Sequence, residues 1–263
     1  MLRSTAMRES RCLMPKRDYH PQPFRTLVVL GESTVRGGPW LTGDERRWPD
    51  VLADLINLCQ EQPVAYHNEG ISASVISPRS PGYEASAKPS AMERYRERVI
   101  AANPDLFVMA YGLNDMRAGM DVQEFAEDVE TIVRDVKSAC DPMIVLTTVY
   151  HITAFDRYPP FDKGSREAAI AYNAETAGIA AENSCLPADV WSAQGEADWL
   201  VHQDGVHANA VGNLVIAHRV FEVIASNCSG LSEKTRRLHE GSAWTKTATR
   251  LAKSGIEPIE CTE

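Results

Sequence analysis

The sequence of 263 residues lacks any long hydrophobic run and any excess of basic side chains. No segment approaches the length of a transmembrane helix, and residues 1–25 lean basic without the apolar core of a signal peptide. The 27 Lys and Arg residues are outnumbered by 36 Asp and Glu residues, giving a formal net charge of −9. This balance excludes a general nucleic-acid or anionic-membrane surface, because either needs a basic face. We therefore expect a cytoplasmic protein with no membrane span and no nucleic-acid partner.

Cysteine patterns typical of metal sites and disulfide scaffolds are also lacking. The six cysteines form no CxxC pair and are spread over the whole chain, at Cys12, Cys59, Cys140, Cys185, Cys228 and Cys261. A disulfide scaffold is not expected at this length, so the pattern predicts reduced, mostly buried thiols. No internal repeat or low-complexity block is visible. We expect neither a metal ion nor a cofactor.

Alternating strand-like and helix-like segments fill the middle of the chain. The pattern predicts strands at 26–31, 63–70, 105–112, 142–150 and 186–191, and helices at 48–61, within 92–105, and at 122–139, 165–183 and 209–226. This alternation indicates a parallel α/β sheet with helices on both faces. We expect one catalytic domain over residues 25–228, a loosely ordered arm over 1–24 and an extension over 229–263.

Glycines and polar residues cluster where three predicted strands end, at 31–34, 68–74 and 112–115. Ligands of parallel sheets bind at the carboxyl ends of the strands, so these clusters are expected along one edge. Ser33 follows the first strand directly and is either a nucleophile or the cap of the next helix. A nucleophile would need a base elsewhere in the chain.

The best candidate base is His207, which stands just before the last predicted helix and three residues after Asp204. In a tight loop, this spacing brings the carboxylate to Nδ1 of the ring, which leaves Nε2 free to accept a proton. Two other interpretations stay open at this point. The segment is a surface turn followed by a helix cap, or His202, Asp204 and His207 bind a metal ion.

Four short motifs, GEST at 31–34, NEG at 68–70, GLND at 112–115 and DGVH at 204–207, resemble the four blocks of the SGNH (GDSL-type) hydrolase superfamily. They occur in the family's order and near its spacing. The resemblance implies a three-layer α/β/α sandwich around a flavodoxin-like, five-stranded parallel sheet. It also implies a serine esterase that works through a catalytic triad and an acyl-enzyme intermediate.

Carried over to this sequence, the resemblance makes Ser33 the nucleophile, His207 its base and Asp204 the residue that orients the base. The oxyanion hole would consist of the backbone amides of Ser33 and Gly70 and the side-chain amide of Asn114. One position departs from the family, because Glu32 replaces the usual Asp before the serine. The sequence also lacks the Gly-x-Ser-x-Gly elbow of the larger α/β-hydrolase fold, since Val35 fills its last position.

The substrate is predicted to be a small-molecule or carbohydrate ester with a small acyl group, in particular acetyl on a polar alcohol. The segments 76–90 and 151–166, expected at the rim, are polar and rich in proline, unlike the lining of a long acyl site. Aromatic residues that could stack on a sugar, or simply fill the core, are Trp40, Tyr83, Trp191 and Trp199. The alternatives are a lysophospholipase, thioesterase or acyltransferase of the same superfamily, and a non-catalytic binding protein on a flavodoxin-like scaffold. The motifs leave the oligomeric state undetermined.

Overall fold

The central sheet is parallel throughout and has five strands. In the computed structural model, which describes residues 16–42 and 45–253, these are β1 (Thr26–Gly31), β2 (Ala65–Gly70), β3 (Leu106–Ala110), β4 (Met143–Thr147) and β5 (Leu186–Ala188). Their order is β2-β1-β3-β4-β5, so the sheet grows in opposite directions on either side of the β1–β3 pair. Such a switch point is where doubly wound sheets bind ligands.

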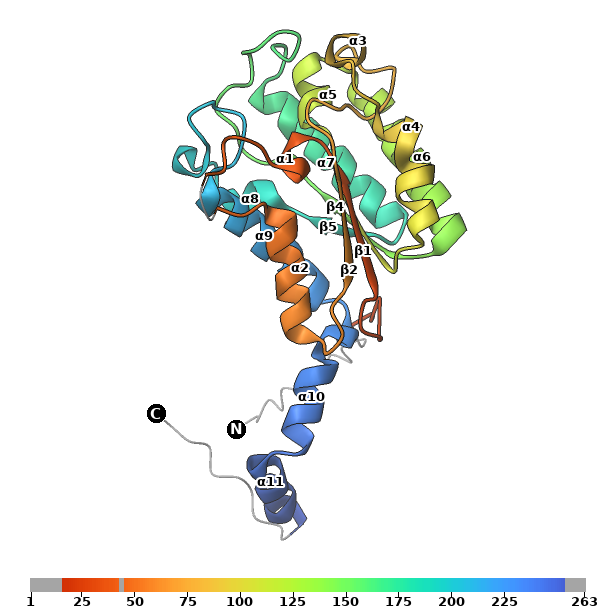
Figure 1. Cartoon of the computed structure of the whole chain (residues 1–263), viewed down its shortest axis with the longest axis vertical. Helices are drawn as coiled ribbons and strands as arrows, with labels where there is room; N and C mark the ends of the chain where they lie inside the picture. The colour runs from red at the N-terminus through yellow and green to blue at the C-terminus, as the bar shows by residue number, and fades with distance from the viewer. Residues whose placement is uncertain (1–15, 43–44, 254–263) are drawn as a thin grey trace, which may run out of the picture.

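Helices cover both faces of the sheet (Figure 1). On one face pack α2 (Trp48–Cys59), α8 (Val190–Gln194) and α9 (Ala210–Ala225), and on the other α4 (Ala91–Arg98), α6 (Val122–Cys140) and α7 (Arg166–Glu182). Every residue of β3 and β4 is buried between these layers. The structure confirms the expected three-layer α/β/α sandwich with a flavodoxin-like sheet.

Several short helices at strand ends were not expected. The chain turns into α1 (Ser33–Arg36) directly after β1 and into α5 (Leu113–Ala118) soon after β3, and α3 (Tyr83–Ser86) lies in the connection between β2 and α4. These segments are too short to show a helical period in the sequence. The strand expected at 186–191 ends at Ala188, because Asp189 caps α8 by accepting a hydrogen bond from the Ser192 amide.

The segments on either side of the sheet domain touch each other. The Tyr19 amide donates to the Asn227 carbonyl oxygen, and Asp18 accepts hydrogen bonds from both the amide and the hydroxyl of Ser229. Phe24 is buried in the core. Residues 18–20 of the arm are thus hydrogen-bonded to residues 227–230, just after α9, across both of the expected domain boundaries.

Beyond α9 the chain forms a short 3-10 helix, η3 (Ser229–Ser232), and then α10 (Glu233–Glu240) and α11 (Ala243–Lys253). The last two helices extend away from the sheet (Figure 1). Other 3-10 turns are η1 (Ile100–Ala102) and η2 (Asp198–Leu200). Cys59, Cys140, Cys185 and Cys228 are free thiols, and Cys12 and Cys261 lie outside the described residues.

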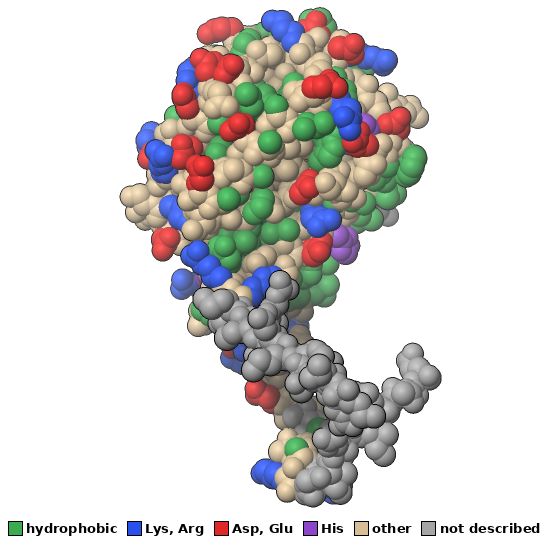
Figure 2. Space-filling model, turned by 180° about the vertical axis from the view of Figure 1, so that it is seen from behind, with side chains coloured by type: hydrophobic (Ala, Val, Ile, Leu, Met, Phe, Trp, Pro, Cys, Tyr) green, Lys and Arg blue, Asp and Glu red, His purple; other side chains and the backbone are tan. Residues whose placement is uncertain are grey.

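Charged side chains of both signs are interspersed on the face shown in Figure 2 rather than gathered by sign. Within residues 16–42 and 45–253, no helix is both long enough and apolar enough to cross a bilayer.

Candidate active site

Ser33 lies at the carboxyl end of β1, as the first residue of α1. The chain reverses here, and the amides of Val35 and Arg36 both donate to the Glu32 carbonyl oxygen. This reversal needs a glycine at position 31, because a Cβ there would lie 2.2 Å from Val35 Cγ2. The turn therefore presents the Ser33 hydroxyl at the β1–β3 switch point.

The structure brings Ser33, His207 and Asp204 into a continuous chain of hydrogen bonds. His207 Nε2 lies 2.9 Å from Ser33 Oγ, and His207 Nδ1 lies 2.8 Å from Asp204 Oδ2. The other oxygen, Asp204 Oδ1, accepts from the backbone amides of Val206 and His207 at 2.8 and 2.9 Å. This carboxylate therefore orients the ring and the loop that carries it.

The loop before α9 is tied down at both ends. Val201 and Ala208 form an antiparallel bridge, and Asn209 then caps α9 by accepting from the Gly212 amide. Gly205 has a φ of 76°, and a Cβ there would approach Ala154 Cβ to 2.7 Å. Glycine thus permits the tight turn that places Asp204 three residues before His207 and beside it.

Burial and hydrogen bonding shift the pKa values of both residues downward. Burial lowers the pKa of His207 from 6.5, and the contact with Asp204 opposes this without cancelling it. Burial also works to raise the pKa of Asp204, but the hydrogen bonds from His207 and Val206 outweigh it and hold that pKa at about 2. At neutral pH the pair is therefore a neutral imidazole beside a carboxylate.

Two of the residues expected in the oxyanion hole, Asn114 and Gly70, differ in whether a donor hydrogen is free. Asn114 is the second residue of α5. Its Nδ2 donates one hydrogen to the Ser74 carbonyl oxygen at 2.9 Å, which leaves the second hydrogen available. The Gly70 amide instead donates to Asn68 Oδ1 at 3.0 Å. Glycine is required at position 70 for packing, since a Cβ would lie 2.2 Å from the Arg36 nitrogen.

The Gly70 amide is thus engaged by a side chain, whereas Ala73 lines the pocket that contains Ser33. Ala73 has a φ of 60° in the turn closed by the Ser74 amide and the Ile71 carbonyl oxygen. No described residue accepts a hydrogen bond from the Ala73 amide. The motif NEG directed attention to Gly70, and nothing in the sequence singles out Ala73, because a positive φ is uncommon at residues other than glycine.

A pocket of about 280 Å³ opens beside Ser33 and His207. Its lining consists of Ser33, Trp40, Ser72, Ala73, Asn114, Arg117, Tyr158, Phe161, Asp204, Val206 and His207. Trp40 stacks on the His207 ring, with 3.5 Å between ring centroids and 9° between planes. The other aromatic candidates for sugar stacking, Tyr83, Trp191 and Trp199, do not line this pocket.

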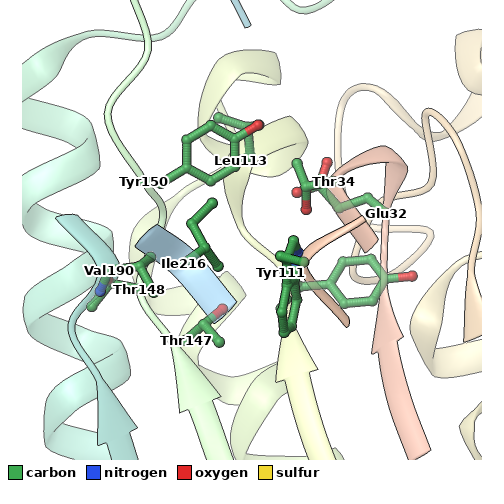
Figure 3. Close-up of a pocket in the computed structure, with 11 residues that line it drawn as sticks. Glu32, Thr34, Tyr111, Leu113, Thr147, Thr148, Tyr150, Val190 and Ile216 are labelled. Carbon is green, nitrogen blue, oxygen red and sulfur yellow. The ribbon is translucent and has the colours of Figure 1, made fainter. Parts of the chain in front are cut away.

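A second, smaller cavity of about 20 Å³ lies deeper, among the carboxyl ends of the strands (Figure 3). Glu32, the residue that departs from the family pattern, is buried against it. Burial raises the pKa of Glu32 well above its usual value, and neighbouring Asp115 raises it further. A buried carboxyl group with a raised pKa therefore lies directly before the serine.

The metal interpretation of His202, Asp204 and His207 does not describe the geometry found. His202 Nδ1 accepts a hydrogen bond from the Asp204 amide at 3.2 Å, while the free nitrogen of His207 is directed to Ser33. Over the described ranges, the structure contains no group of three or more His, Cys, Asp or Glu side chains arranged to hold a metal ion.

A family model described as the GDSL-like Lipase/Acylhydrolase family matches residues 29–215. No curated protein matches the chain. Similar solved structures include a lipase/acylhydrolase from Enterococcus faecalis, with 20% identity and a TM-score of 0.61 over 77% of this chain and 96% of that one. An acetylxylan esterase from Geobacillus stearothermophilus gives 20% identity and a TM-score of 0.57, over 76% and 94% of the two chains. LAE5, an α/β hydrolase from the metagenome of Lake Arreo in Spain, has 18% sequence identity and a TM-score of 0.60, over 79% of this chain and 97% of that one.

Proposed function

The chain belongs to the GDSL-like lipase/acylhydrolase family of carboxylic ester hydrolases, and we propose that it is a serine esterase that removes small acyl groups from polar alcohols. The observation that carries this proposal is the hydrogen-bonded chain from Ser33 Oγ through His207 to Asp204. A serine acting only as a helix cap would not need a buried imidazole 2.9 Å away, with its second nitrogen held by a carboxylate.

In the proposed reaction, Ser33 Oγ attacks the ester carbonyl carbon while its proton passes to His207 Nε2. His207 then returns the proton to the leaving alcohol oxygen as the carbon–oxygen bond breaks, which leaves an acyl group on Ser33. A water molecule attacks this acyl-enzyme in the same way, and Ser33 recovers its proton when the acid departs. Asp204 stabilises the imidazolium that forms in each half.

Negative charge on the carbonyl oxygen requires donors in the pocket. We assign this role to the Ser33 amide, to the free hydrogen of Asn114 Nδ2 and to the Ala73 amide, which takes the place first expected for Gly70. The Ser74 carbonyl oxygen holds the Asn114 amide group in place before substrate arrives. Donors fixed in this way need no reorganisation as charge develops.

The size and lining of the pocket support a small acyl group. About 280 Å³ lies at the lower end for ligand sites, and the pocket must also admit part of the alcohol. Arg117, Ser72 and Tyr158 add polar groups to the wall. We therefore propose acetyl esters of polar or carbohydrate alcohols as the substrate class, and the similar acetylxylan esterase makes acetylated xylo-oligosaccharides the first compounds to test.

An acyl-chain series on p-nitrophenyl esters tests this proposal. We expect kcat/KM to be highest for the acetate and to fall about tenfold or more by the octanoate, because a longer chain overfills the pocket. Rates are followed by p-nitrophenolate release, and acetylated sugars are then compared by acetate release. A maximum at the octanoate would favour a lysophospholipase or thioesterase, and product esters formed with an added alcohol would favour an acyltransferase.

The pH dependence of hydrolysis follows from the lowered pKa of His207. Only the neutral ring can accept the Ser33 proton, so activity is lost as pH falls through the His207 pKa. Since that pKa lies below 6.5, we expect the acid limb of kcat/KM to have its midpoint below pH 6.5. The measurement is a pH–rate profile with p-nitrophenyl acetate, with full recovery on return to neutral pH as control. A midpoint above pH 7 would contradict the described environment of His207.

A further inference from the structure

Arg117 is a buried cation in the wall of the proposed ester site. It lies on α5, three residues after Asn114, so that the helix brings both side chains to one face. Only 3% of Arg117 is exposed, yet its side chain lines the pocket that contains Ser33 and His207. No role in the proposed acyl transfer accounts for a guanidinium at this position.

The hydrogen bonds of Arg117 are far from complete. Its Nη2 donates to the Arg157 carbonyl oxygen at 2.7 Å, and its buried Nε has no partner. Among the described residues, no carboxylate lies within ion-pair distance of the guanidinium. A guanidinium carries five N–H donors, and a buried charge that is not paired is costly. The fold therefore keeps a cation here with no carboxylate of the described residues in direct contact with it.

The acidic neighbours of Arg117 do not form an ion pair with it. Glu32 and Asp204 act on the guanidinium electrostatically, but neither carboxyl group comes within ion-pair distance of it. The carboxylate of Asp204 is engaged by the ring of His207 and by two backbone amides. The remaining charge of Arg117 is available to whatever enters the pocket.

We propose that Arg117 is a specificity residue that binds a carboxylate carried by the substrate close to its ester bond. A guanidinium pairs with a carboxylate through parallel N–H···O bonds, and such charge-assisted bonds are strong when little water is present. This inference rests on the proposed esterase function and narrows its substrates to acidic esters, such as acylated hydroxy acids, sugar acids or half-esters of diacids.

Two matched pairs of substrates test the inference on the intact protein. On the alcohol side, O-acetyl-lactate is compared with O-acetyl-lactamide, and on the acyl side, monoethyl succinate with ethyl succinamate. Each pair differs only in a carboxylate against a neutral amide, and acid release is followed in a pH-stat. We expect the parent enzyme to prefer the carboxylate in kcat/KM by about ten- to a hundredfold in at least one pair, with the preference weakening as salt is added.

Variants of Arg117 assign the preference to this side chain. In Arg117→Gln the carboxylate-to-amide ratio of kcat/KM is expected to fall to about one. Arg117→Lys keeps the charge but loses the planar guanidinium with its two parallel N–H donors, so an intermediate ratio is expected. A ratio of about one in the parent for both pairs, or an unchanged ratio in Arg117→Gln, overturns the inference. The parent ratios decide the matter even if a variant fails to fold.

The two proposals fail separately in this experiment. Suppose that the esters carrying a neutral amide are hydrolysed at the ester bond and that this hydrolysis requires Ser33. Carboxylate-to-amide ratios of about one in the parent then remove the role of Arg117 and leave the esterase function intact. No Ser33-dependent hydrolysis of any of the four esters overturns both.

Discussion

Replacing Ser33 with alanine is expected to lower kcat for p-nitrophenyl acetate by roughly a millionfold, close to complete loss. The variant removes the hydroxyl oxygen that lies in hydrogen-bond contact with His207 Nε2, so no acyl-enzyme can form. Initial rates on purified, folded protein give the measurement. Activity near the parental value would remove Ser33 from the mechanism.

A fluorophosphonate probe provides a second readout of the same change, because it labels only an activated serine. We expect labelling of the parent and of Ser226→Ala, which removes an exposed hydroxyl after α9, and none of Ser33→Ala. The free energy of unfolding of Ser33→Ala should stay within about 1 kcal/mol of the parental value, since the change deletes one small polar group at a turn. Lost activity together with a large loss of stability would instead indicate a structural role.

Replacing Asn114 with alanine is expected to lower kcat by about a hundred- to a thousandfold and to leave KM nearly unchanged. The reason is that Nδ2 would donate to the carbonyl oxygen only once that oxygen carries negative charge. A loss confined to the transition state lowers kcat and kcat/KM together. Steady-state kinetics with p-nitrophenyl acetate measure both parameters.

The hydrogen bond from Asn114 to the Ser74 carbonyl oxygen makes a stability control necessary. Deleting the side chain leaves that buried oxygen without its donor, so the melting temperature should also fall moderately. Measuring kcat well below the melting transition separates the two effects. A lowered melting temperature with an unchanged kcat per folded molecule would mean that Asn114 only shapes the turn after β3.

The sequence predicted the sheet from strong local patterns, and it predicted the meeting of Ser33, Asp204 and His207 from the four motifs that resemble the SGNH superfamily. Apolar strands alternating with amphipathic helices determine a parallel sheet, and parallel strands end at one edge. The Asp-x-x-His spacing needs only a tight turn to bring carboxylate and ring together, and Gly205 supplies it. Nothing in this reasoning depends on side-chain packing.

Features that depend on packing were not predictable in the same way. Gly70 was expected to be an oxyanion donor, and the structure shows its amide donating to Asn68 Oδ1 and its missing side chain making room for the backbone of α1. Trp40, considered for sugar stacking, lines the pocket and stacks on the His207 ring, a contact that the sequence did not indicate. Arg117 could have been noticed from its spacing of three after Asn114, yet the short helix α5 that gives this spacing its meaning was not expected.

The wall of the pocket and the reacting groups come from different parts of the chain. Tyr158 and Phe161 belong to the connection between β4 and α7, which is anchored by the Tyr158 hydroxyl on the Asp204 carbonyl oxygen and by the Arg117 side chain on Arg157. Ser33 and His207 are held by β1 and by the loop before α9. Loops tolerate insertion and exchange better than the elements they connect. Diversification of this enzyme, in nature or in a mutant library, can therefore act on the β4–α7 connection and alter substrate choice while the acyl-transfer groups stay where they are.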